Sequence, residues 1–128
     1  PNRAYYDSMQ DYINVPDLNR FEQPEEYYST LLHEAAHSTG HESRLNRNIS
    51  TSFGSHAYSK EELTAEIAAA YLIEYTGIDL KKVVGNTAAY IKHWSARLKE
   101  DPKLIVQSAA ASEKACNFIL GKGLVTEA

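Results

Sequence analysis

The residues with the clearest chemical pattern are His33, Glu34 and His37, which form a His-Glu-x-x-His sequence. Residues four apart on a helix lie on one face, one turn apart, so both imidazoles can reach one metal ion. Glu34, next to the first histidine, can take a proton from a water that the metal activates. If the stretch is a helix, the pattern predicts a catalytic metal site.

Residues 24–39 have the features of such a helix. Pro24 suits a first helical turn, and the acids that follow it suit the positive end of the helix dipole. Gly40 is a typical helix stop. Apolar or aromatic side chains recur at three-four spacing, which predicts one buried stripe; they are Tyr28, Leu31, Leu32, Ala35 and Ala36. The two histidines lie beside this stripe, at the edge of the expected core, where a metal cleft needs them.

A third metal ligand must come from elsewhere, because a catalytic zinc usually has three protein ligands and keeps one position for water. In one large group of metalloproteases the third ligand is a histidine six residues beyond the second. That position is Ser43 here, which excludes this group. His41 follows His37 by four residues but is a weak candidate, because Gly40 is expected to end the helix before it.

Glu62 and Glu66 are better candidates for the third ligand. They lie four apart, on one face of a helix predicted over residues 59–76. One carboxylate could bind the metal while the other holds a histidine from behind. A competing role exists for Glu62, since Ser59 and the residues after it fit a capping box in which Glu62 folds back on the helix start.

The run from Glu61 to Glu66 is similar to the Asn-Glu-x-x-x-Asp pattern of thermolysin-like proteases, and Glu62 with its alanine-rich surroundings resembles the glutamate helix of ImmA-type peptidases. In the thermolysin pattern the glutamate binds zinc and the later acid orients a histidine. The resemblance implies that Glu62 is the ligand and that Glu66 lies behind a histidine. We favour Glu62 as ligand to Zn²⁺ and keep Glu66 as the alternative.

Four further side chains are weaker candidates for the site. A hydrolase of this kind often needs a donor to the oxyanion that forms as water attacks a carbonyl. Tyr58 and His56, near the start of the second helix, could supply it, although a structural role is the simpler interpretation. Arg44 and Arg47 lie in a predicted loop over residues 40–58. They could bind a substrate carboxylate or phosphate, or anchor the loop through an acid.

The remaining pattern predicts a helix-rich α+β domain. The chain has 128 residues, of which 43% are hydrophobic and 23% charged, as in an ordinary single globular domain. Two short strands, over residues 4–6 and 12–15, are expected to form a small N-terminal hairpin. Beside the two helices above, we expect helices over residues 86–99 and from residue 101 to about 120.

Composition also limits the cellular setting. The net charge of -4 lacks the basic character of an autonomous nucleic-acid binder. The single cysteine, Cys116, excludes an internal disulfide and fits a reducing compartment, and we expect it to fill space in the core. With no apolar run of membrane length and no signal peptide, a cytoplasmic protein is expected. The first residue, Pro1, indicates a fragment of something longer.

Several segments together resemble the metallopeptidase domain of ArdC-type antirestriction proteins, which also occurs in polyvalent phage and plasmid proteins. The matching segments run through the following blocks: Asp11-Tyr12-Ile13-x-Val15-Pro16, Tyr27-Tyr28, His33-Glu34-x-x-His37-x-x-Gly40-His41-x-x-Arg44-Leu45-Asn46-Arg47, Tyr58-x-Lys60-Glu61-Glu62-Leu63-x-Ala65-Glu66, and Ala89-Tyr90-Ile91 with Trp94 and Leu98-Lys99-x-Asp101-Pro102. They cover nearly the whole chain, and their order is more specific than the metal motif alone.

The resemblance implies a zincin-like domain encoded on a mobile element and linked to protection of incoming DNA from restriction. In the family this domain follows an N-terminal domain that binds single-stranded DNA. We therefore expect residues 1–128 to be one domain from the C-terminal part of a longer protein. The acidic composition agrees with DNA binding that resides outside these residues.

The sequence thus predicts a zinc-dependent peptidase-like domain that acts on a protein or peptide substrate. His33, His37 and Glu62 or Glu66 would bind Zn²⁺, and Glu34 would be the general base. Tyr58 would donate a hydrogen bond to the developing oxyanion. The rival hypothesis is a non-catalytic binding module with a structural metal, which blocks restriction by occupying DNA or the restriction enzyme.

Overall fold

The computed structural model describes residues 3–49, 55–79 and 87–122. Its elements in chain order are β1 (Tyr5–Asp7), β2 (Tyr12–Asn14), the 3-10 helix η1 (Leu18–Arg20), α1 (Pro24–Ser38), α2 (His56–Thr76), α3 (Thr87–Glu100) and α4 (Lys103–Leu120). The predicted α+β class, mainly helical with an N-terminal hairpin, is confirmed. The short helix η1 was not predicted. Residue 86, where we expected the third helix to begin, lies outside the described residues.

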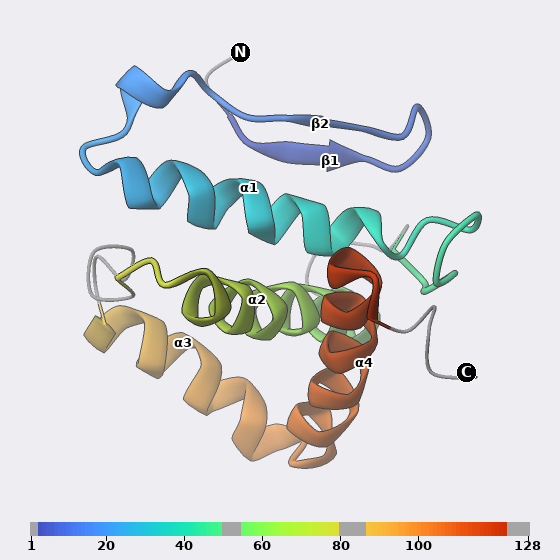
Figure 1. Cartoon of the computed structure of the whole chain (residues 1–128). Coiled ribbons are helices and arrows are strands. Elements are labelled where there is room, and N and C mark those ends of the chain that lie inside the picture. The colour runs from blue at the N-terminus through green and yellow to red at the C-terminus, as the bar shows by residue number, and fades with distance from the viewer. Residues whose placement is uncertain (1–2, 50–54, 80–86, 123–128) are drawn as a thin grey trace.

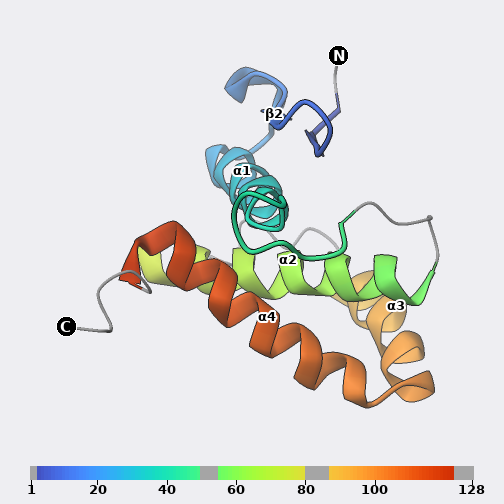
Figure 2. The same cartoon turned by 90° about the vertical axis from the view of Figure 1, so that its right-hand side faces the viewer.

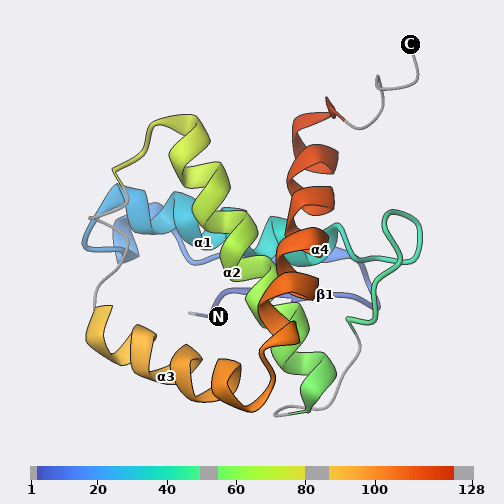
Figure 3. The same ribbon diagram turned by 90° about the horizontal axis from the view of Figure 1, so that it is seen from below.

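The elements are stacked around the two helices that carry the candidate ligands. The antiparallel β1–β2 hairpin, with Tyr6 opposite Ile13, lies along one side of α1, and α2 lies along the other (Figure 1). Seen along α1, the hairpin is above it and both α2 and α4 are below it (Figure 2). Helix α4 crosses α2 (Figure 3), so α2 packs against α1 on one side and α4 on another. None of the described helices is long and apolar enough to cross a membrane.

Small side chains allow these helices to approach closely. The main core cluster consists of Ala36, Ala65, Ala68, Leu72, Ala115 and Cys116, and four of these are fully shielded alanines. Alanines at a helix–helix contact leave little between the backbones, so α1 and α2 can place short side chains such as histidine and glutamate opposite each other. The Cys116 thiol lies 3.6 Å from the carbonyl oxygen of Ala68, which confirms the prediction that it fills the core.

Helix α2 begins earlier than predicted, and its cap differs. The Ser55 hydroxyl accepts a hydrogen bond from the backbone N–H of Tyr58 at 3.0 Å, so Ser55 is the N-cap and the helix starts at His56. The predicted capping box is therefore wrong, since Ser59 is buried inside the helix. Glu62 does not fold back on the helix start. The predicted end is correct, because Gly77 follows the helix with a left-handed φ of 83°.

The segment from Thr39 to Ile49 folds back against the end of α1. The N–H of Leu45 donates to the carbonyl of Thr39 at 2.8 Å, and that of Arg47 to the carbonyl of Gly40 at 3.0 Å. Gly40 follows the helix end as predicted, but close approach is what requires it. A Cβ there would lie 2.6 Å from Cγ2 of Ile49.

Candidate metal centre

Two histidines of α1 and one glutamate of α2 meet between these helices. Nε2 of His33 lies 3.2 Å from Nε2 of His37, and the two nitrogens lie 3.5 and 3.0 Å from the carboxylate oxygens of Glu62. One ligand atom from each residue lies within 4.8 Å of the other two. Two imidazoles and one carboxylate are a donor set of catalytic zinc sites, so these residues fit a divalent metal. The structure brings together both histidines predicted as ligands and the glutamate that we favoured.

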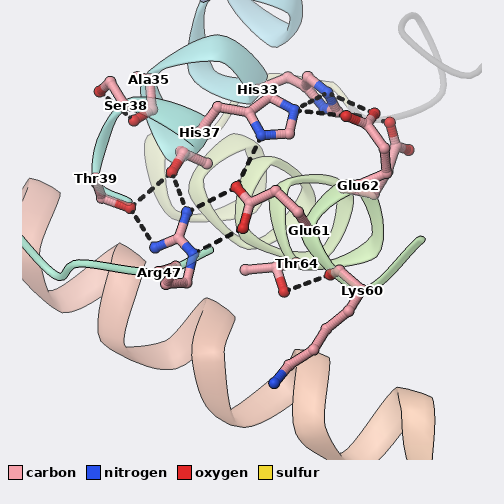
Figure 4. A network of polar contacts seen from close by, with 12 residues as sticks. His33, Ala35, His37, Ser38, Thr39, Arg47, Lys60, Glu61, Glu62 and Thr64 are labelled. Atoms are coloured by element: carbon pink, nitrogen blue, oxygen red, sulfur yellow. Dashed lines mark hydrogen bonds and ion pairs between the residues drawn. The ribbon is translucent and has the colours of Figure 1, made fainter. Parts of the chain in front are cut away.

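Each imidazole is held on its outer side by a different carboxylate. Nδ1 of His33 lies 3.2 Å from Glu66, and Nδ1 of His37 lies 2.9 Å from Glu61. Ligating histidines commonly use their second nitrogen in this way, which fixes the tautomer and the direction of the ring. Glu62 thus lies on the side where the two Nε2 atoms converge, whereas Glu66 lies behind His33 (Figure 4 shows Glu62 and both rings).

Glu61 is a site residue that the sequence analysis missed. It is adjacent to Glu62, and neighbouring residues point about 100° apart around a helix, so only one of them was expected to face the histidines. The two imidazoles, however, are one turn apart along α1 and meet different faces of α2. The available clue was the presence of three acids in one helix turn and a half, enough for one ligand and one acid behind each histidine.

Arg47 connects Glu61 to the end of α1. Its Nε and one terminal nitrogen donate to the two carboxylate oxygens of Glu61, each at 2.9 Å (Figure 4). It also donates to the hydroxyl of Thr39 at 2.8 Å and to the carbonyl of Ala36 at 2.9 Å. Arg44 donates to the carbonyl of Ser38 at 2.8 Å and pairs with Asp11. Of the two roles considered for these arginines, the structure shows the anchoring one.

The charges in the cluster are strongly coupled. Burial lowers the pKa of His33, but hydrogen bonds to Glu62 and Glu66 outweigh it and raise this pKa to about 10. Burial raises the pKa of Glu62, but the hydrogen bonds from His33 and the second histidine outweigh it and lower this pKa to about 2. The carboxylates around the two rings thus favour positive charge between α1 and α2. A divalent cation bound by the same atoms would supply that charge.

Glu34 lies beside the ligands in a cleft of about 370 Å³. The residue is buried, and this burial raises the pKa of its carboxyl, while the charges of the neighbouring histidines oppose the rise. A hydrogen bond from the backbone of Tyr6, in β1, also holds the carboxylate. The hairpin therefore forms one wall of the cleft and orients the predicted general base.

Tyr58 lies in the same cleft, as the sequence analysis suggested. It precedes Glu62 by four residues on α2, so both side chains project from one face of that helix. Burial and the charge of Glu62 raise the pKa of the Tyr58 phenol, which therefore keeps its proton at neutral pH. A protonated phenol can donate a hydrogen bond.

The other two histidines considered from the sequence lie apart from the cluster. Nδ1 of His41 bonds with the hydroxyl of Ser43 at 2.8 Å, and His41 follows the end of α1 as expected. His56 is the first residue of α2 and is 60% exposed, with Nδ1 3.5 Å from Asp101. Neither contributes to the metal cluster or to the cleft beside it.

Comparison with known proteins agrees with this geometry. A family model described as zincin-like metallopeptidase matches residues 1–112. The protein DNA primase TraC of Escherichia coli is 44% identical over 119 residues, which are 93% of this chain and 11% of TraC. The crystal structure of the antirestriction protein ArdC from plasmid R388 in its Mn(II)-bound form superposes with a TM-score of 0.75 at 36% identity, over 97% of this chain and 46% of ArdC.

The metal-free crystal structure of ArdC is also similar, with a TM-score of 0.72 and 38% identity over 95% of this chain and 43% of that one. This chain thus spans about a tenth of TraC and less than half of ArdC. The resemblance to the ArdC-type metallopeptidase domain is confirmed. Together, the match over residues 1–112 and the structural likeness show that the chain belongs to the family of zincin-like metallopeptidases.

Proposed function

We propose that this domain is a metal-dependent peptidase that works within an antirestriction protein of a mobile element. One observation carries the proposal: Nε2 of His33, Nε2 of His37 and the Glu62 carboxylate converge, while a separate carboxylate backs each ring. In this assignment Glu62 is the third ligand, and Glu66 and Glu61 orient the histidines. Three protein ligands leave a coordination position open, which is typical of catalytic rather than structural metal sites.

Zn²⁺ is the metal that this donor set favours. Imidazole and carboxylate ligands bind Zn²⁺ more tightly than Mn²⁺ in the usual order of divalent metals. The relative ArdC was crystallised in a Mn(II)-bound form, which supports a divalent cation as the metal of this domain. We expect Zn²⁺ to displace Mn²⁺ from this protein when both are offered at equal concentration.

The chain's own residues supply the proton transfers. A bound Zn²⁺ would lower the pKa of a water toward ~7 and polarise the carbonyl of the scissile peptide. Glu34 accepts the water proton on its carboxylate and delivers it to the leaving amine. The burial that raises the pKa of Glu34 makes it a better proton carrier at neutral pH. The Tyr58 phenol donates a hydrogen bond to the oxygen on which negative charge develops.

The biological setting follows from the relatives. ArdC is described as an antirestriction protein and TraC as a DNA primase, so the relatives act on or beside DNA. This domain covers only part of each and has a net charge of -4, so we assign DNA binding to other parts of the parent protein. The peptidase substrate would then be a protein met in the cytoplasm, where incoming DNA is attacked.

A second function is a binding module that blocks restriction by occupying DNA or the restriction enzyme. The observation that favours it is the metal-free structure of ArdC, which matches this fold nearly as well as the Mn(II)-bound one. The fold of the relative therefore does not depend on metal, and a surface could act without it. The open, three-ligand geometry argues against a purely structural metal in this chain.

The variant Glu34→Gln separates the two functions. It keeps the shape of the side chain but removes the proton acceptor, so we expect full metal content and a loss of peptide hydrolysis of about 10²- to 10⁴-fold. Cleavage is measured on a mixed peptide library, and protection against restriction on the parent protein. Full protection by a Glu34→Gln parent protein would favour the binding module. A wild-type protein that retains no divalent metal would contradict both the centre and the peptidase.

A further inference from the structure

We propose that Arg47 is a positioning residue of the metal centre, which acts through Glu61 to set the orientation of His37 and hence the affinity for metal. The proposal rests on the proposed metal centre and adds a residue that touches neither metal nor substrate. Arg47 belongs to the segment between Thr39 and Ile49, outside both ligand helices.

The contacts form a continuous chain from the arginine to the imidazole. Oε2 of Glu61 lies 2.9 Å from Nδ1 of His37 and 2.9 Å from a terminal nitrogen of Arg47, and Oε1 accepts from Nε of Arg47 at 2.9 Å. The Glu61 and Arg47 side chains are only 7% and 14% exposed. A buried carboxylate that is held at both oxygens by a planar guanidinium cannot rotate without losing charged hydrogen bonds.

The same guanidinium also holds the helix that carries His37. It donates to the carbonyl of Ala36, the residue immediately before His37, and to the hydroxyl of Thr39. One side chain thus joins the backbone of α1 beside a ligand to the α2 acid behind that ligand (Figure 4). This arrangement fixes both the position of the ring and the direction of its Nδ1–H.

The consequence for the metal is a fixed tautomer. When Nδ1–H donates to Glu61, the lone pair of His37 is on Nε2, the atom that faces His33 and Glu62. Without Arg47 the buried Glu61 loses its main counter-charge and can turn away from Nδ1. A lysine would keep the charge but not the two-pronged contact, because its ammonium is a single point of donation.

The surrounding segment is shaped to place this side chain. Asn46, the residue before Arg47, has a φ of 53°, in the left-handed region that asparagine tolerates. Gly40 leaves space for the arginine, since a Cβ there would lie 3.1 Å from one of its terminal nitrogens. These residues belong to the Gly40–Arg47 block on which the family resemblance partly rests.

The experiment compares Arg47→Ala, Arg47→Lys and the control Arg44→Ala. Arg44 anchors the same segment through the carbonyl of Ser38, and it bonds with Asp11 and Tyr6 of the hairpin region rather than with Glu61. The apparent affinity for Zn²⁺ is measured by competition with a chromogenic chelator. We expect Arg47→Ala to lose about 10- to 100-fold in affinity, Arg47→Lys about 10-fold, and Arg44→Ala none. Folding of each apo protein is checked by circular dichroism, and Arg47→Lys serves as the test if Arg47→Ala does not fold.

NMR of the imidazole nitrogens reports the hydrogen bonding of His37 Nδ1, which a general loss of stability would not change. In the metal-free wild type and in Arg44→Ala, His37 should show its Nδ1 bonded to an acceptor, and this signature should be lost or mixed in Arg47→Ala. Equal losses of affinity in Arg44→Ala and Arg47→Ala, or a wild-type affinity in both Arg47 variants, would overturn the proposal while the metal centre stood. A wild type that binds no Zn²⁺ would overturn the centre, and this proposal with it.

Discussion

Three carboxylates on α2 take different places around the two imidazoles. Glu62 faces the nitrogens that converge, and Glu66 and Glu61 lie behind His33 and His37. The spacing explains this division, because Glu62 and Glu66 share a helix face while Glu61 points to one side, toward the second histidine. Glu61 is buried, whereas Glu62 and Glu66 are each about one-third exposed.

This division predicts unequal effects of removing the carboxylate charges. Glu62→Gln should lower the affinity for Zn²⁺ by more than about 100-fold, because it removes an anionic ligand. Glu66→Gln should lower it by about 10- to 100-fold, the usual cost of losing an orienting acid. Chelator competition measures both. A larger loss in Glu66→Gln than in Glu62→Gln would reverse the assignment of ligand and orienting acid.

Tyr58 yields a kinetic prediction. Tyr58→Phe removes the hydroxyl that would donate to the developing oxyanion, so kcat on a cleaved peptide should fall by about 10²-fold while metal content and KM stay the same. Tyr71→Phe is the matched control, since Tyr71 lies exposed on the same helix. An unchanged kcat in Tyr58→Phe would assign the phenol to structure alone.

Much of the candidate site could be predicted from residue types and spacing. The His-Glu-x-x-His pattern carries its own geometry once the stretch is helical, and the pair of acids four apart could be placed on one face. Glu61 and its partner Arg47 could not be assigned in this way. Their contact depends on how the segment after α1 folds back, which is a tertiary arrangement with no local pattern.

At the scale of elements, the close contact between α1 and α2 is what places the ligands. Ala36 of α1 and Ala65 and Ala68 of α2 are fully shielded in the core cluster that these two helices share with α4. Larger side chains there would push the helices apart and separate the histidines from Glu62. The packing that forms the core therefore also sets the dimensions of the metal centre.

Enlarging one of these alanines tests that link. Ala68→Leu should destabilise the fold by about 1–3 kcal/mol through overpacking and should also weaken metal binding. Ala70→Leu, two residues away on the exposed side of α2, should have little effect on either. Urea denaturation gives the free energy of unfolding, and titration with Zn²⁺ gives the affinity. If Ala68→Leu binds Zn²⁺ as well as the control does, helix spacing does not set the site.

The positions of the helices were predicted better than the interactions that begin and end them. Pro24 begins α1 and Gly77 ends α2 as their local chemistry requires. Two serines near the start of α2 could each cap a helix, and the sequence alone favoured Ser59, whereas the structure uses Ser55. Gly40 was expected to stop α1 by its backbone freedom, but the structure needs it because Ile49 and Arg47 pack against it.

At the scale of the whole molecule, a bound metal would join helix α1 to helix α2. Its ligands come from α1 and α2, and α2 also packs against α4, so an ion bound only by the folded state would stabilise the entire domain. The stabilisation follows from mass action and amounts to about 2.7 kcal/mol at a free metal concentration of 100 times Kd.

Thermal unfolding tests this linkage. Adding Zn²⁺ to the apo protein should raise Tm, and the rise should grow with the logarithm of the metal concentration and reverse with a chelator. His33→Ala should show no such rise, because it removes one ligand. A Tm that is independent of Zn²⁺ in the wild type, or equal rises in the wild type and His33→Ala, would show that the metal is not held by these helices.

A crystal structure of the chain grown with one equivalent of Zn²⁺ tests the central claim most directly. The account predicts one ion bound by Nε2 of His33, Nε2 of His37 and the Glu62 carboxylate, with Glu66 and Glu61 still on the Nδ1 atoms. An ion held by Glu66 with Glu62 turned away, or the absence of any ion between α1 and α2, would contradict it.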